Sequence, residues 1–116
     1  MFLNVESLKS IGGFTGAPVE KEIKWKQGET EYTATVFIRP LSYKSTVADL
    51  MAVNEKKDQL AARIAASVCD ADGQPVFTGD DVTGDADPER GAMDGNLVMS
   101  LLSVIAEVNG MGKTQN

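Results

Sequence analysis

Residues 19–38 read VEKEIKWKQGETEYTATVFI, and this stretch decides the fold. Its first half alternates with the period of a half-buried strand, and one face of that strand consists of Val19, Lys21, Ile23 and Trp25. The segment Gln27-Gly28-Glu29-Thr30 supplies a turn. The second half is rich in β-branched and aromatic residues, and one of its faces consists of Tyr32, Ala34, Val36 and Ile38. The stretch therefore predicts an antiparallel β-hairpin, which Pro40 ends.

Helical spacing follows the hairpin. Ser42 or Ser45 can cap a first helix, Asn54 is a candidate break after it, and its apolar face would be Val47, Leu50 and Met51. Residues 57–65 resume the spacing, with Leu60, Ala61 and Ile64 on one face. The segment Ala71-Asp72-Gly73-Gln74 then separates two short extended runs, 67–70 and 75–77. An Asp-Gly pair between apolar residues predicts a small second hairpin there.

The last helix has the strongest periodicity in the chain. Asp94 or Asn96 can cap its start, Asn109-Gly110 ends it, and its apolar positions are Leu97, Leu101, Val104, Ile105 and Val108. Before it, residues 70–94 carry eight acidic side chains against one basic side chain. This composition predicts an acidic mobile loop at 79–95, with one helical turn near Asp80-Asp81-Val82.

These elements predict a small, single α+β domain. It consists of an N-terminal antiparallel β-hairpin, helices, a short second hairpin and a long C-terminal amphipathic helix. We expect the domain to span residues 19–110. Residues 1–18, rich in glycine and without clear periodicity, are expected to form a flexible N-terminal arm, and residues 111–116 a short C-terminal tail.

Composition excludes several classes of function. The chain has 116 residues, no His, one Cys and a net charge of −6. Without His it has no His-based catalytic triad and no His-ligated metal, and one Cys cannot form an internal disulfide or a cysteine-cluster zinc site. The acidic balance argues against nucleic-acid binding, and no apolar run is long enough to cross a bilayer. We expect no enzymatic activity, no cofactor, no metal, and no nucleic-acid or membrane partner.

Two motifs resemble ligand loops and fail on spacing. If Gly73 is the sixth residue of an EF-hand calcium loop, Val68 and Gly79 occupy its first and twelfth positions, where acidic ligands are needed. Gly112-Lys113-Thr114 matches the end of a phosphate-binding loop, but too few residues follow it to form the helix that faces the phosphates. What remains is a non-enzymatic interaction module.

Several segments resemble the tail assembly chaperones of long-tailed (siphophage-type) bacteriophages. They are Arg39-Pro40-Leu41, Ala62-Arg63-Ile64-Ala65, the run from Val68 to Thr78, Gly79-Asp80-Asp81-Val82 and Val108-Asn109-Gly110-Met111-Gly112. The resemblance spans about residues 19–112. The chain departs from the family pattern in the long stretch from Thr83 to Gly95.

The resemblance implies a late protein that acts in the bacterial host cytoplasm and is absent from the mature virion. Such a chaperone binds the tape measure protein, keeps it soluble, and recruits major tail protein subunits directly or through a frameshift-extended form. The alternative is a structural tail component, such as a tail terminator or a head–tail connector. Self-association as a homo-oligomer, through an open strand edge, also stays open.

Partner-binding candidates come from two groups of apolar residues. Trp25 and Phe77 could form a partner-binding patch or belong to the core. On the last helix, Leu101 and Ile105 could either dock a partner or fill the core, and a domain of this size favours the core. Val98 and Leu102 lie beside that stripe and are the better candidates for contact.

Overall fold

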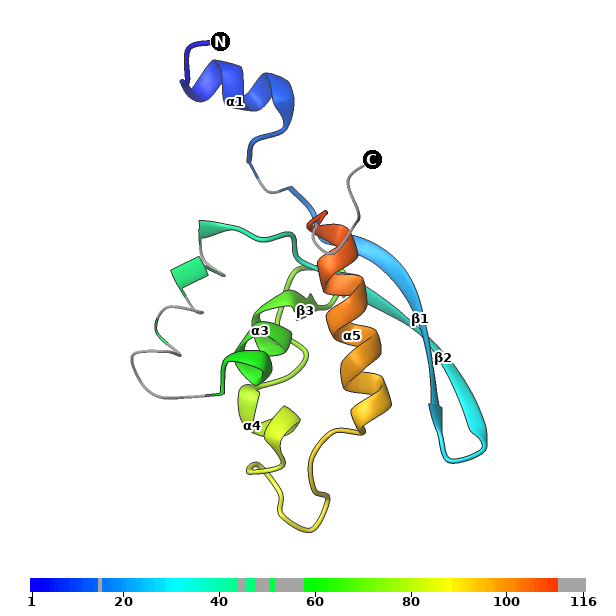
Figure 1. The fold of residues 1–116 in the computed structure, drawn as a ribbon. Coiled ribbons are helices and arrows are strands. Elements are labelled where there is room, and N and C mark those ends of the chain that lie inside the picture. The colour runs from blue at the N-terminus through cyan, green and yellow to red at the C-terminus, as the bar shows by residue number, and fades with distance from the viewer. Residues whose placement is uncertain (15, 44–45, 48–50, 52–57, 111–116) are drawn as a thin grey trace.

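The computed structural model describes all residues except 15, 44–45, 48–50, 52–57 and 111–116. It contains a three-stranded antiparallel sheet of order β1-β2-β3, with helices packed against it. The longest described helix, α5, is the last, and it lies along the hairpin (Figure 1). The helices α3 and α4 lie on the side of α5 away from the hairpin (Figure 1). This arrangement confirms the predicted small α+β fold. None of the described helices has the length and apolar character needed to span a bilayer.

The hairpin forms as the alternation predicts. β1 (Val19–Gln27) pairs with β2 (Thr30–Ile38) along its whole length, from Val19 opposite Ile38 to Gln27 opposite Thr30. Gly28 begins the two-residue turn with φ +64, a left-handed conformation that glycine adopts without strain. The predicted inner faces are the ones that turn toward the core, since Ile23 and Ile38 are buried.

The short β3 (Val68–Cys69) joins the sheet at the end of β2, where Ile38 pairs with Val68 and Phe37 with Cys69. The predicted second hairpin is reduced to a tight turn after this strand, with Cys69 bridging to Pro75. Asp70 makes that turn, because its side-chain Oδ1 accepts hydrogen bonds from the main-chain N–H of Asp72 and of Gln74, both at 2.9 Å.

Each described helix after the hairpin starts at a side-chain cap. Asp58 caps α3 (Gln59–Ser67), Thr78 caps the single-turn α4 (Gly79–Thr83), and Asp94 caps α5 (Gly95–Val108). The short helix α4 confirms the helical turn predicted near Asp80, and α5 confirms the predicted last helix.

The core is one apolar cluster shared by the sheet and the three helices. Ile38, Ile64 and Leu101 are its largest fully buried side chains. Removing each of them from water stabilises the fold by roughly 1.5–3 kcal/mol. The other members are Ile23, Ala61, Val68, Val82, Val104 and Ile105.

The first eighteen residues contain a helix that sequence periodicity does not show. The helix α1 (Val5–Ile11) lies within the expected N-terminal arm, where the sequence pattern predicts no helix. It forms for local reasons: the side chains of Asn4 and Ser7 each accept the other's main-chain N–H, and Gly12 closes the helix at φ +70. None of its residues is buried, and it projects from the body (Figure 1).

The acidic segment 79–95 makes contacts within itself. After α4, the main-chain N–H of Met93 donates to the carbonyl of Val82 at 3.1 Å. Arg90 forms an ion pair with Asp81 at 3.1 Å. The mobility predicted for this segment stays a prediction.

Parts of two other predictions lie outside the described residues. In the first predicted helix, the N–H of Thr46 donates to the carbonyl of Ser42 at 2.9 Å, but 44–45 and 48–50 are not described, nor is the predicted break at Asn54. The predicted tail, 111–116, is also outside them.

Candidate functional site

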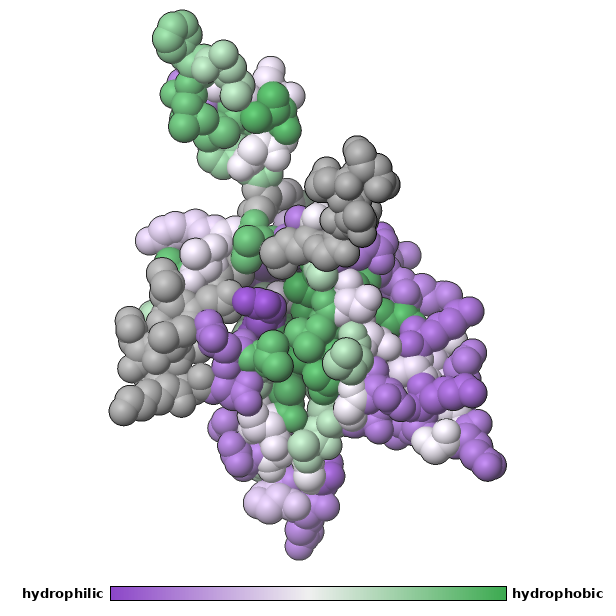
Figure 2. Space-filling model, viewed as in Figure 1, coloured by the Kyte–Doolittle hydropathy of each residue, from purple (hydrophilic) through white to green (hydrophobic). Residues whose placement is uncertain are grey.

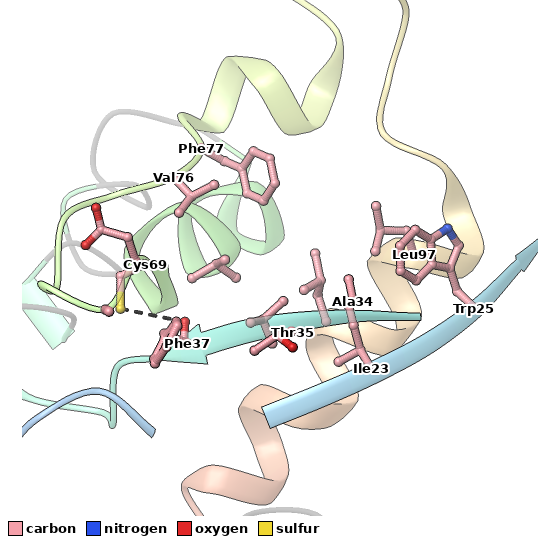
Figure 3. Close-up of a pocket in the computed structure, with 14 residues that line it drawn as sticks. Ile23, Trp25, Ala34, Thr35, Phe37, Cys69, Val76, Phe77 and Leu97 are labelled. Atoms are coloured by element: carbon pink, nitrogen blue, oxygen red, sulfur yellow. Dashed lines mark hydrogen bonds between the residues drawn. The ribbon is translucent and has the colours of Figure 1, made fainter. Parts of the chain in front are cut away.

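An apolar groove of about 400 Å³ opens beside β2. We call it the β2 groove, and define it by Ile23, Trp25, Ala34, Val36, Phe77 and Leu97. Figure 3 shows Phe77 on one side and Trp25 and Leu97 on the other, with β2 running below the space between them. The groove therefore joins strand, helix and loop residues that are far apart in sequence.

The aromatic walls of the groove are held in place by neighbouring contacts. The ring of Trp25 stacks on that of Tyr32, its partner across the hairpin, with 5.6 Å between centroids. Its indole Nε1 donates to Oε1 of Gln27 at 2.8 Å. Phe77 is positioned by its chain neighbours, since the N–H of Val76 donates to the carbonyl of Val68 at 3.4 Å and Thr78 caps α4. These contacts give the groove a preformed shape.

Charge is confined to one end of the groove. Among the described lining residues, Asp70 carries the one ionisable carboxyl group, and the rest are apolar or neutral, apart from the thiol of Cys69. Asp70 also begins the acidic stretch that runs to residue 94. A ligand of the groove would thus meet an apolar surface with a negative charge at one end.

The six predicted partner-binding residues fall into three places. Leu101 and Ile105 are 1% and 2% exposed, so both belong to the core and offer little surface to a partner. Trp25 and Phe77 are half-buried and face the groove. The remaining two, Val98 and Leu102, are half-buried on α5.

The surface over α5 is hydrophobic, and it lies between hydrophilic side chains of the hairpin and hydrophilic side chains toward α3 and α4 (Figure 2). Val98 and Leu102 are two of the half-buried apolar residues of α5, with Leu97 and Val108 the others packed against the core. The surface of Val98 and Leu102 is separate from the residues that line the β2 groove.

Sequence reasoning missed four groove residues as site residues, because each also fits the core-facing pattern of its own element: Ile23, Ala34, Val36 and Leu97. The signal that could have found the strand residues among them is the pairing of Trp25 with Tyr32 in the hairpin register. That pairing places a large ring at the edge of the apolar face instead of its centre.

The single cysteine has the surroundings of a structural thiol. Cys69 is 3% exposed, and its Sγ donates to the carbonyl of Phe37 at 3.6 Å. Burial raises the pKa of the Cys69 thiol, and the nearby Arg39 guanidinium opposes that change only in part. Within the described residues, no group of three or more acidic, Cys or His side chains is arranged to hold a metal ion. The described arrangement is suited to binding an apolar segment.

Comparison with known proteins gives a match over nearly the whole chain. The family model described as phage tail assembly chaperone, TAC, matches residues 6–109. No curated protein and no solved structure matches the chain.

Proposed function

The chain belongs to the phage tail assembly chaperone family, and from this membership we propose that it binds the tape measure protein and keeps it soluble during tail assembly. In this proposal it also recruits major tail protein subunits, directly or through a frameshift-extended form. It acts by binding, without catalysis, in the bacterial host cytoplasm, and it leaves before the virion is complete.

The β2 groove is the observation that best supports a binding role. A long tape measure protein exposes apolar side chains until the tail closes around it, and such side chains need a temporary apolar cover to stay in solution. A preformed groove with two aromatic walls offers that cover at small ordering cost. The net charge of −6 keeps the chaperone itself soluble.

Co-expression with the tape measure protein of the same phage tests the proposal. We expect the tape measure protein to become soluble, to co-purify with this chain, and to assemble into virions that lack this chain. Recovery of this chain from purified virions, with the tape measure protein still insoluble, would instead support a structural tail component.

A matched pair of variants connects the test to the groove. Phe77→Ser removes one aromatic wall, whereas Leu60→Ser changes an exposed apolar residue on α3 that does not line the groove. We expect the Phe77 variant to solubilise much less tape measure protein and the Leu60 variant to match the unchanged chain. Equal loss in both variants would contradict a role for the groove.

A further inference from the structure

The two long edges of the hairpin differ in how their outward main-chain groups are hydrogen-bonded. On the outer edge of β1, two main-chain carbonyls are occupied by side chains of α5. The Ser100 hydroxyl donates to the carbonyl of Lys24, and the Asn96 amide donates to that of Lys26, both at 2.8 Å. This edge is thereby closed to another strand.

The outer edge of β2 is open over most of its length. The N–H of Arg39 donates to the carbonyl of Ser67 at 2.8 Å, and Phe37 pairs with Cys69, so these two residues direct their main-chain groups away from β1. Main-chain groups alternate in direction along an antiparallel strand. Hence Thr35, Thr33 and Glu31 also direct theirs to this outer side. No described strand pairs with β2 beyond Phe37 on that side.

The side chain of Asp70 ends β3 and so leaves this edge open. Continued in the same register, β3 would place residue 71 opposite Thr35 and residue 73 opposite Thr33. Instead, the hydrogen bonds from the N–H groups of Asp72 and Gln74 to the Asp70 carboxylate turn the chain back toward Pro75. A strand added at the open edge would therefore extend the hydrogen-bond ladder that β3 begins on β2.

The open edge and the β2 groove lie together. The residues around the groove include Thr35 on the edge strand and Ala71 just after β3, in addition to the aromatic walls. Figure 3 shows Thr35 on β2 with Phe77 across from it. A strand laid along this edge would direct alternate side chains toward the groove. Main-chain pairing would then supply affinity and the groove would supply selectivity.

We propose that the outer edge of β2, from Glu31 to Thr35, binds an extended segment of the partner as an added β-strand. The segment would carry apolar side chains at alternate positions, for the groove, and a Lys or Arg at the end near Asp70, for charge complementarity. This inference rests on the proposed function, because it takes the partner to be the tape measure protein. It specifies an extended segment, although the groove by itself would also admit a helix.

Amide hydrogen exchange of the full chain, free and in complex with the tape measure protein, tests the inference at the atoms it names. In the free chain the amides of Thr33 and Thr35 are expected to exchange fast, and those of Tyr32 and Ala34, which face β1, slowly. In the complex we expect exchange at Thr33 and Thr35 to slow by at least about tenfold. Tyr32 and Ala34 act as internal controls.

Two variants at Thr33 test the added strand through their affinity for the tape measure protein. Thr33→Pro removes the outward N–H, which an edge strand tolerates, while Thr33→Ala keeps it. We expect the Pro variant to bind the tape measure protein about tenfold more weakly and the Ala variant to bind within about twofold of the unchanged chain. Circular dichroism checks that both variants fold. If the Pro variant does not fold, the hydrogen-exchange experiment on the unchanged chain tests the added strand instead.

The outcomes separate this inference from the proposed function. A stable complex in which Thr33 and Thr35 exchange as fast as in the free chain overturns the added strand and leaves the chaperone role intact. Protection that appears in the free chain as its concentration rises assigns the edge to a second copy and overturns the partner segment. Failure of the tape measure protein to bind at all overturns the proposed function, and this inference with it.

Discussion

The hydroxyl of Ser100 on α5 donates to the main-chain carbonyl of Lys24 on β1, at 2.8 Å. One turn earlier on the same helix face, Asn96 makes the equivalent bond to Lys26. The last helix thus does two things: its apolar stripe fills the core, and its polar side chains satisfy one edge of the sheet. An ion pair between Lys21 and Glu107, at 2.9 Å, extends the same seam toward the end of α5.

Replacing Ser100 by Ala should reduce the free energy of unfolding by about 1 kcal/mol, because the Lys24 carbonyl loses its partner. Urea unfolding monitored by circular dichroism measures the change. Ser103→Ala is the matched control: Ser103 lies on the same helix, is exposed, and should change stability by less than about 0.5 kcal/mol. Equal effects at the two positions would show that the bond to β1 contributes nothing.

Leu101→Ala should reduce the free energy of unfolding by about 2–5 kcal/mol, because it opens a cavity at a side chain that is 1% exposed. Met99→Ala is the control, since Met99 is 67% exposed on the same helix. Urea unfolding compares the two. A loss of partner binding by Leu101→Ala at unchanged stability would instead place Leu101 on a docking surface and contradict its role in the core.

Much of the fold can be predicted from local sequence patterns. The alternation from Val19 to Ile38 predicts the hairpin and its inner face, and the spacing from Leu97 to Val108 predicts α5 with Asp94 as one of its two candidate caps. These elements are predictable because burial of one face imposes a period that can be counted directly.

What could not be predicted depends on contacts between distant residues. The pairing of Val68 with Ile38 places β3 beside β2, and no local pattern specifies that neighbour. The helix α1 depends on a reciprocal cap between Asn4 and Ser7 without any apolar period. The β2 groove is likewise invisible in sequence, since Phe77 meets the strand only through the turn at Asp70.

Gly84→Ala should destabilise the fold by about 1–3 kcal/mol. Gly84 has φ +94, and an added Cβ would lie 2.7 Å from the main-chain nitrogen of Ala92. This contact is with main chain, which cannot move aside as the end of a flexible side chain can. The control is Gly95→Ala at the start of α5, where an added Cβ meets nothing within 4 Å, and which should be neutral or stabilising by about 0.5 kcal/mol. Thermal unfolding of both variants measures the contrast. Equal melting temperatures would contradict the close packing at Ala92.

The Asp81 carboxyl should make stability depend on acid pH. The main-chain N–H of Thr78, which donates to it at 2.9 Å, and the Arg90 guanidinium hold its pKa below the ordinary value of 3.8. A lowered pKa in the folded state gives a stabilisation that is present above pH 3.8 and is lost as the pH falls through the lower folded value. Asp81→Asn should therefore be less stable than the unchanged chain at neutral pH, and the difference should narrow in acid.

Urea unfolding of the two proteins across this pH range measures that difference. Asp85→Asn is the control, because Asp85 is exposed and lies outside the capping box of α4. A stability difference between Asp81→Asn and the unchanged chain that stays constant with pH would show that the carboxylate charge plays no part.

The single tryptophan allows occupation of the β2 groove to be observed directly. Trp25 is the only Trp of the chain, and it forms one wall of the groove. Chaperone labelled with 5-fluorotryptophan and mixed with unlabelled tape measure protein should give a shifted ¹⁹F resonance, because the partner replaces water beside the ring. The Phe77→Ser variant should bind weakly and show little shift, whereas Leu60→Ser should shift like the unchanged chain. A complex that forms with full affinity and leaves the resonance unmoved would place the partner elsewhere, with the surface of Val98 and Leu102 on α5 the next to test.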